Sequence, residues 1–249
     1  MDTIERQADI EAQGRIDLAA AFRWAARLGF HESVANHFSL ALSPDGRKFL
    51  LNPRGRHFSR VKASELLLLD GPSRKVLKGE GPPDLTAWYI HSRLHMRVPH
   101  ARCVLHVHSR YATALAALKR VELLPVDQNC ARFFERVAYD EVFTGFALDD
   151  AEGDRIANAL GNKSIMVMGN HGITVCASSV AQAFDELYYF ERACETFMIA
   201  LSTGKELNVI PDEIARRTAQ QWQEYPDFAA LHFAELKRIL DEEEPGYRQ

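Results

Sequence analysis

The residues best suited to chemistry in this 249-residue chain are histidines. His106 and His108 flank Val107 at the end of the apolar run 101–107, which predicts a strand. Alternate residues of a strand point to the same face, so the two imidazoles project together. Such a pair is suited to gripping a divalent cation. The alternative is that backbone groups or water satisfy each imidazole separately.

A third histidine extends the pair. His171 lies in the turn G-N-H-G, residues 169–172, directly after the apolar run 164–168, which predicts a buried strand. The glycines on either side leave room for its ring to approach another element. Three imidazoles with open positions for a substrate suit Zn, Mn, Fe or Co.

Two other histidines form a rival pair. His91 and His95 are four residues apart and share one face of an expected helix. The helical zinc motif of proteases needs glutamate after the first histidine, and this chain has Ser92. We therefore interpret His91 as a packing or supporting residue and His95 as exposed. Glu191, inside an apolar helical stripe, is interpreted as paired with a nearby arginine.

Strands and helices are mixed throughout the chain. Strands are expected at 34–42, 48–51, 66–69, 101–107, 137–143, 164–168 and 173–176, and helices at 10–29, 84–97, 111–119, 151–160, 178–201 and 211–240, the last broken at Pro226. The turn 43–46 makes a hairpin, so the sheet is at least partly antiparallel. We expect one α/β/α domain over 1–249, with an N-terminal helix 10–29, a C-terminal helical extension 206–249 and a frayed tail.

Composition excludes several classes of function. The formal charge of −4 gives no reason to expect nucleic acid or an anionic membrane as a partner. No apolar run approaches the length of a membrane span, and the first residues carry no apolar signal core. Four widely spaced cysteines favour reduced thiols, so we expect a cytoplasmic protein. Neither a G-x-G-x-x-G nor a Walker A sequence occurs.

Four stretches together resemble the class II aldolase/adducin family over roughly residues 15–205. They are NHFSLAL at 36–42, LNPRGRHFSRVKASELLLLD at 51–70, YIHSRLHMRVPHARCVLHVHSRYATALAAL at 89–118 and GNHGITVCASSVAQAFDELYYFERACE at 169–195. The resemblance implies a three-layer α/β/α fold with a central, mostly antiparallel sheet. It also implies a homotetramer and one divalent ion, zinc first and manganese, iron or cobalt as alternatives, on His106, His108 and His171.

The chain departs from the aldolases at their catalytic and phosphate-binding positions. Ala87 stands where the family has its catalytic glutamate, which leaves Asp84, one helical turn earlier, as the candidate catalytic carboxylate. The phosphate-binding serines are replaced by Leu85 and Thr86. A carboxylate remains a suitable anion for the candidate substrate-binding residues, which are His37, Arg54, Gly55, Thr86 and Gln128.

These residues favour a divalent-metal-dependent carbon–carbon lyase, retro-aldol or decarboxylating, that acts on a small non-phosphorylated oxo- or hydroxy-acid. Both reactions leave negative charge beside a carbonyl, which a Lewis acid stabilises. The alternative is an adducin-like interaction protein that keeps a vestigial metal site, and loss of the glutamate favours it. Iron-dependent oxygen chemistry at the same histidines is a third interpretation.

Overall fold

The computed structural model describes residues 3–225 and 227–249. At its centre is an eight-stranded sheet in the order β4-β3-β2-β1-β5-β8-β7-β6. Neighbouring strands pair antiparallel except β6 and β7, which are parallel. The strands are β1 (His37–Ala41), β2 (Lys48–Leu51), β3 (Leu67–Asp70), β4 (Lys75–Lys78), β5 (Cys103–Val107), β6 (Val137–Asp140), β7 (Ile165–Met168) and β8 (Gly172–Ala177).

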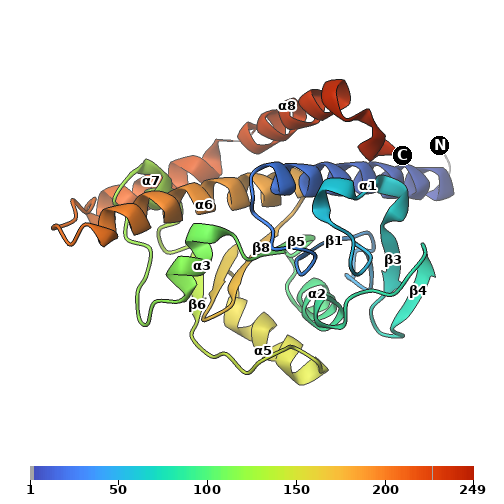
Figure 1. The fold of residues 1–249 in the computed structure, drawn as a ribbon, viewed down its shortest axis with the longest axis horizontal. Coiled ribbons are helices and arrows are strands. Elements are labelled where there is room, and N and C mark those ends of the chain that lie inside the picture. Colours follow the sequence, from blue (N-terminus) through green and yellow to red (C-terminus); the bar gives the residue numbers. More distant parts are fainter. Residues whose placement is uncertain (1–2, 226) are drawn as a thin grey trace.

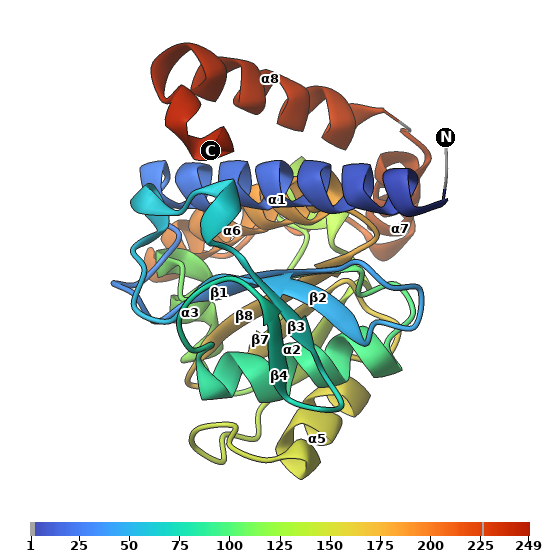
Figure 2. The ribbon, with the colours of Figure 1, turned by 90° about the vertical axis from the view of Figure 1, so that its right-hand side faces the viewer.

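Helices cover both faces of this sheet, which confirms the three-layer α/β/α expectation. Helices α1 and α6 lie over one face and α2 and α5 over the other, while α8 packs on the outer side of α1 (Figures 1 and 2). The helices are α1 (Thr3–Arg27), α2 (Leu85–Arg97), α3 (Arg110–Ala116), α4 (Gln128–Arg132), α5 (Asp150–Leu160), α6 (Val180–Ser202), α7 (Asp212–Glu224) and α8 (Phe228–Glu243), with 3-10 turns η1 (Phe58–Arg60), η2 (Ala63–Glu65) and η3 (Pro245–Arg248). None of the described helices combines the length and the apolar character that crossing a bilayer requires.

Side-chain alternation along β5 decides which face of the sheet carries the chemistry. Leu105 and Val107 belong to the core that includes residues of α1 and α6. Val104 belongs to the opposite core, which includes residues of α2 and α5. His106 shares the parity of Val104, so its ring is directed toward the α2 and α5 layer.

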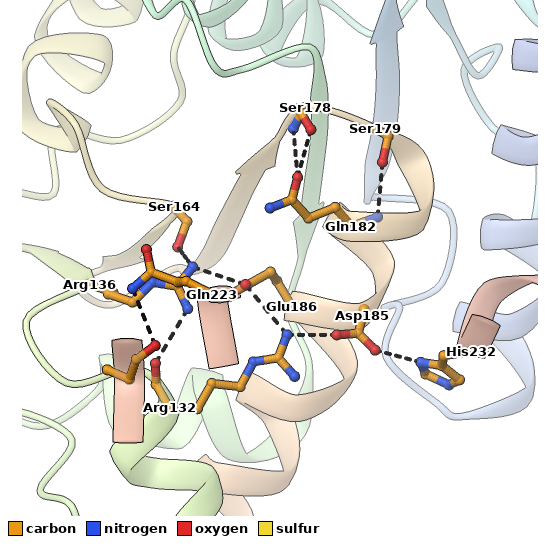
Figure 3. Close-up of polar contacts among 11 residues, drawn as sticks. Arg132, Arg136, Ser164, Ser178, Ser179, Gln182, Asp185, Glu186, Gln223 and His232 are labelled. Carbon is orange, nitrogen blue, oxygen red and sulfur yellow. Dashed lines mark hydrogen bonds and ion pairs between the residues drawn. The ribbon is translucent and has the colours of Figure 1, made fainter. Parts of the chain in front are cut away.

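A buried ionic cluster joins α6 to α4 and α8. Arg132 on α4 lies 2.6 Å from the Asp185 carboxylate and 3.4 Å from Glu186, and His232 on α8 contacts the other Asp185 oxygen (Figure 3). The Arg132 guanidinium also stacks near the ring of Trp222 on α7, 4.8 Å from its centroid. These contacts attach the C-terminal helices to the body of the domain.

The chain ends differ from the sequence expectation. The first helix begins at Thr3 rather than at residue 10. The expected helix 211–240 is two helices, α7 and α8, and Pro226, where the break was expected, lies outside the described residues. The expectation of a frayed tail is wrong, because Tyr247 is fully buried and donates a hydrogen bond to Asp241. Burying this aromatic ring outweighs the entropy of ordering the last residues.

Candidate metal centre

Three histidines from two distant stretches of the chain meet where β5 ends and β8 begins. His106, His108 and His171 each offer one ring nitrogen, and these atoms all lie within 4.8 Å of one another. The Nε2 atoms of His106 and His108 are 3.1 Å apart. Two nitrogens on one tetrahedral zinc, at about 2.0–2.1 Å each, lie about 3.3 Å apart. The spacing therefore fits ligands of a single ion.

Neighbouring side chains orient the first two rings through their Nδ1 atoms. His106 pairs in register with Thr174 on β8, and its Nδ1 lies 3.3 Å from the Thr174 hydroxyl oxygen. His108 Nδ1 lies 2.6 Å from a carboxylate oxygen of Glu32. When Nδ1 donates in both rings, both Nε2 atoms keep the lone pair that a metal needs.

The turn between β7 and β8 carries His171 to this point. Asn170 adopts a left-handed backbone conformation, with φ of 57°, and its N–H donates to the Ala116 carbonyl. Gly172 packs so closely that a Cβ there would lie 2.5 Å from the Val107 carbonyl oxygen and 2.7 Å from His108 Cδ2. Glycine at 172 is therefore required for His171 to approach the other two histidines.

Glu191 supports the site from α6. Its carboxylate accepts hydrogen bonds from the Ser109 hydroxyl and from the backbone N–H groups of Tyr111 and Ala112. The expectation that Glu191 pairs with an arginine is wrong. The carboxylate instead accepts from N–H groups in the first turn of α3, which begins two residues after His108. A negative charge at a helix N-terminus is also favourable for the helix dipole.

Burial keeps two of the clustered imidazoles, those of His106 and His171, neutral. It lowers the pKa of His171 to about 4, and it holds the pKa of His106 well below its ordinary value. Nearby histidines reinforce both shifts, because like charges would repel. Neutral imidazole is the form that binds metal, so these two rings are ready to bind at neutral pH.

The histidines open into a cavity of about 410 Å³. Its wall is mainly apolar and includes a stretch of the loop between β6 and α5, in which Phe146 is 84% exposed. Of the predicted substrate-binding residues, His37 and Thr86 line it. The apolar lining consists of Ala35, Ile90, Val142, Phe143, Phe146, Ala147, Ile156 and Met168.

Three other predicted substrate-binding residues lie elsewhere among the described residues. Arg54 is largely exposed, with its Nε 3.8 Å from Asp84. Gln128 lines a different cavity beside α7, and Gly55 is not among the residues that line the histidine cavity. Their roles in binding substrate stay predictions.

Asp84, the predicted catalytic carboxylate, caps α2. One of its oxygens accepts hydrogen bonds from the backbone N–H groups of Thr86 and Ala87 and from the Thr86 hydroxyl. Partial burial by itself raises the pKa of Asp84, but these hydrogen bonds reverse the shift and hold the pKa below its ordinary value. A carboxylate stabilised in this way is a weak base.

Sequence reasoning missed some residues of the site and misplaced one. Glu32 and Arg155 line the cavity, but neither belongs to a motif with the histidines. The expectation that His95 is exposed is wrong, because the side chain is 4% exposed and bonded to Ser39. Its four-residue spacing from His91 indicated that the two share a helix face, which here packs on the sheet.

Comparison with known proteins agrees with this geometry. Residues 16–198 match the family described as Class II Aldolase and Adducin N-terminal domain. A crystal structure of an aldolase II superfamily protein from Pseudomonas syringae is 33% identical and has a TM-score of 0.88, covering 96% of each chain.

Two relatives from Streptomyces carry names of enzymes. Decarboxylase NovR of Streptomyces niveus is 30% identical over 90% of this chain and 84% of its own. The 4-hydroxy-3-prenylphenylpyruvate oxygenase/4-hydroxy-3-prenylbenzoate synthase of Streptomyces roseochromogenus is 29% identical over 90% of this chain and 82% of its own. The family match and these likenesses show that the chain belongs to the class II aldolase/adducin family.

Proposed function

We propose that this chain is a divalent-metal-dependent carbon–carbon lyase acting on a small, non-phosphorylated oxo- or hydroxy-acid. The observation that carries the proposal is the convergence of His106, His108 and His171 at a cavity of about 410 Å³. Three neutral nitrogens leave coordination positions open toward that cavity. When bound, a divalent ion polarises a substrate carbonyl and stabilises the negative charge that develops on its oxygen as the bond breaks.

The lining of the cavity supports an acid that carries an apolar group. Arg155, a cationic residue of this lining, already pairs with Asp140 and Glu152, so no phosphate-binding cation is free among the described lining residues. Phe143 and Phe146 offer aromatic surface instead. The name of one Streptomyces relative, a 4-hydroxy-3-prenylphenylpyruvate oxygenase, points to an aromatic acid, and the name of the other, a decarboxylase, points to cleavage of a carbon–carbon bond. An aromatic 2-oxo or 2-hydroxy acid is therefore the substrate class we favour.

The protein's own groups have separate roles in this proposal. Glu32 accepts the Nδ1–H of His108 and so holds the ring with Nε2 toward the metal position. Residues 142–147 line part of the cavity and offer mainly apolar surface to the substrate. The Thr86 hydroxyl donates to Asp84, which leaves its oxygen lone pairs for a substrate donor.

Metal analysis of the purified protein tests the proposal. We expect about one divalent ion per chain, mostly zinc, and its loss in His106→Ala and His108→Ala. His100→Ala is the matched control, because His100 bonds the Lys163 carbonyl outside the site. Stoichiometric metal in the double variant His106→Ala/His108→Ala would refute the metal centre.

Turnover is then measured with aromatic 2-oxo and 2-hydroxy acids and with a sugar phosphate, following release of carbon dioxide and of carbonyl products. We expect the protein to turn over the acids but not the sugar phosphate, and to lose this activity when a chelator removes the metal. A metal-loaded protein inactive on every acid would favour the adducin-like alternative. Oxygen consumption by the iron-loaded protein would favour the oxygenase interpretation.

Asp84→Asn tests the catalytic assignment of Asp84, which stays a prediction. Asparagine is also a good helix cap, so the variant preserves the fold while it removes the carboxylate. Because the hydrogen bonds that lower the pKa of Asp84 make it a weak base, we expect turnover to stay within about tenfold of the wild type, less than the roughly 10²- to 10⁴-fold that a general base contributes. A fall of several orders of magnitude with unchanged stability would establish Asp84 as the base.

The proposal also includes a cytoplasmic homotetramer. The four cysteines are free and buried, as reduced thiols would be. Exposed apolar side chains beside the cavity, Val142, Phe143 and Phe146, would be covered by a neighbouring subunit. Native mass spectrometry tests the assembly, and a monomer would refute it.

A further inference from the structure

A continuous chain of hydrogen bonds runs from the cavity into the interior between β1 and α2. His37 Nδ1 lies 2.7 Å from His91 Nε2, and His91 Nδ1 lies 2.5 Å from the Ser39 hydroxyl oxygen. The same hydroxyl lies 2.7 Å from His95 Nε2. His95 Nδ1 then lies 2.6 Å from the carbonyl oxygen of Ala101.

Secondary structure aligns these four side chains. His37 and Ser39 are alternate residues of β1, so they share one face of the sheet. His91 and His95 are one helical turn apart on α2, so they share one face of the helix. All four are buried, and the chain joins the two faces.

The carbonyl at the inner end fixes the direction of every bond. A carbonyl oxygen only accepts, so His95 Nδ1 carries a proton and, in the neutral ring, Nε2 accepts from the Ser39 hydroxyl. The Ser39 hydroxyl has only one proton, and the bond to His95 uses it, so His91 Nδ1 must carry a proton and donate it to the Ser39 oxygen. In the neutral ring His91 Nε2 then has no proton and accepts a hydrogen bond. His37 Nδ1 must therefore donate to His91, which leaves His37 Nε2 without a proton.

This assignment requires that all three rings are neutral. His37, His91 and His95 are all almost completely buried, which disfavours a charge on any of the three rings. Burial lowers the pKa of His95 to about 4. Burial also places the pKa of His91 well below its ordinary value. When the rings are neutral at pH 7, the hydrogen-bond partners of each histidine determine which of its two nitrogens carries the proton.

The outer end of the chain reaches the candidate metal centre. His37 lines the cavity, and its ring stacks on His106 with centroids 4.8 Å apart. The two residues are also register partners of β1 and β5. Its Nε2 has no hydrogen-bond partner among the residues that the structure describes. His37 lies outside the group of three mutually close ligands but lines the same cavity, so its ring is placed to meet a substrate bound there.

We infer that the chain His91–Ser39–His95 locks His37 as the Nδ1–H tautomer and so presents an unprotonated Nε2 to the substrate beside the metal position. The ligand group that this nitrogen selects is a hydrogen-bond donor, the hydroxyl of a hydroxy acid. His91, Ser39 and His95 are positioning residues that act through His37. The substrate part of the inference rests on the proposed function, whereas the tautomer part does not.

Nitrogen NMR of the ¹⁵N-histidine-labelled protein, recorded with zinc and again with a chelator, tests the tautomer without any turnover. His37 is assigned by its loss in His37→Gln. We expect a protonated Nδ1 and an unprotonated Nε2 at neutral pH. A His37 ring with the proton on Nε2 would overturn the inference, and the variant used for the assignment, His37→Gln, is the one variant that this result needs to fold.

Two variants then interrupt the series of hydrogen bonds at different residues. Ser39→Ala and His95→Leu remove the link to the Ala101 carbonyl, so we expect His37 to become a mixture of tautomers. Ser39→Thr restores a hydroxyl and should restore the single tautomer. His100→Leu is the control, since it removes a histidine that bonds a backbone carbonyl outside the chain. An unchanged His37 spectrum in both broken variants would show that the chain does not fix the tautomer.

The substrate part is tested with 3-phenyllactate and 3-phenylpropionate, which differ by one hydroxyl. In zinc-loaded wild type, phenyllactate should bind more tightly, through the metal and through His37. In His37→Leu the preference should fall by about three- to tenfold, the size of one neutral hydrogen bond. An unchanged preference would overturn the role of His37 in binding. Failure of the metal centre would instead show as absent metal, with the tautomer result unaffected.

Discussion

The ring of His108 shows how much of a metal site depends on a residue that is not a ligand. Glu32 lies in the loop after α1, and its side chain is 65% exposed, yet one of its oxygens fixes Nδ1 of His108. The two residues are 76 positions apart in the sequence. Such supporting carboxylates hold the ligand ring in place and raise its basicity.

Replacing Glu32 should weaken the metal centre without removing it. We expect Glu32→Ala to bind zinc about 10- to 100-fold more weakly, because His108 loses the acceptor that orients it. The zinc affinity of Glu32→Gln, which keeps an acceptor oxygen, should lie between those of Glu32→Ala and the wild type. Competition titration with a chromogenic chelator measures the affinity. Glu235→Ala, at an exposed ion pair with Arg238, is the control, and equal affinity in Glu32→Ala and wild type would rule out this role.

At the scale of elements, α3 is held by another helix. It spans only Arg110–Ala116, and the side chain of its cap residue Ser109 makes no capping bond. Glu191 on α6 accepts from Ser109 and from two N–H groups of the first turn instead. Because α3 follows β5 directly, this contact also fixes the backbone of His108.

Truncating this carboxylate should destabilise the fold. We expect Glu191→Ala to lower the free energy of unfolding by about 1–3 kcal/mol, because buried donors at the start of α3 lose their acceptor. Urea unfolding measures the change. Glu195→Ala, one turn along α6 in an exposed pair with Arg192, should cost less than about 1 kcal/mol. Equal stability of Glu191→Ala and wild type would show that water replaces the carboxylate at no cost.

At the scale of the whole molecule, buried neutral histidines couple folding to pH. The pKa of His37 is lowered to about 3 and that of His95 to about 4, whereas the unfolded chain has ordinary values near 6.5. Between these values the unfolded state binds more protons than the folded state. The stabilisation is therefore fully present above pH 6.5 and is lost as pH falls toward the folded values.

The metal-free protein should consequently unfold in mild acid. Each of these two histidines costs about 1.4 kcal/mol per pH unit well below pH 6.5, so these two alone cost about 3 kcal/mol per unit. Burial also lowers the pKa values of His91, His106 and His171, so these histidines steepen the slope in the same direction. Urea unfolding at pH 7.0, 6.0 and 5.5 in the presence of a chelator measures this slope. His95→Gln should reduce this slope by about 1.4 kcal/mol per pH unit, the contribution of one proton. Stability that stays constant from pH 7.0 to 5.5 would contradict neutral burial.

Local patterns predicted most of the elements, and they failed where tertiary contacts decide. The apolar runs 101–107 and 164–168 and the strand expected at 173–176 predicted β5, β7 and β8, at whose ends the three histidines lie. Helix α4 was not predicted, because its five residues, Gln128–Arg132, are too few for a helical period to show. The interpretation of 1–249 as a single domain stays a prediction.

The sequence by itself determined which residue types could bind a metal and on which face of each element they lie, because backbone geometry fixes the periods of strands and helices. Only the tertiary structure decided that Glu32 supports His108, that Glu191 caps α3, and that His95 is buried in a hydrogen-bonded chain. Those contacts join segments far apart in sequence, and they depend on how whole layers pack against one another. No spacing along the chain encodes that packing.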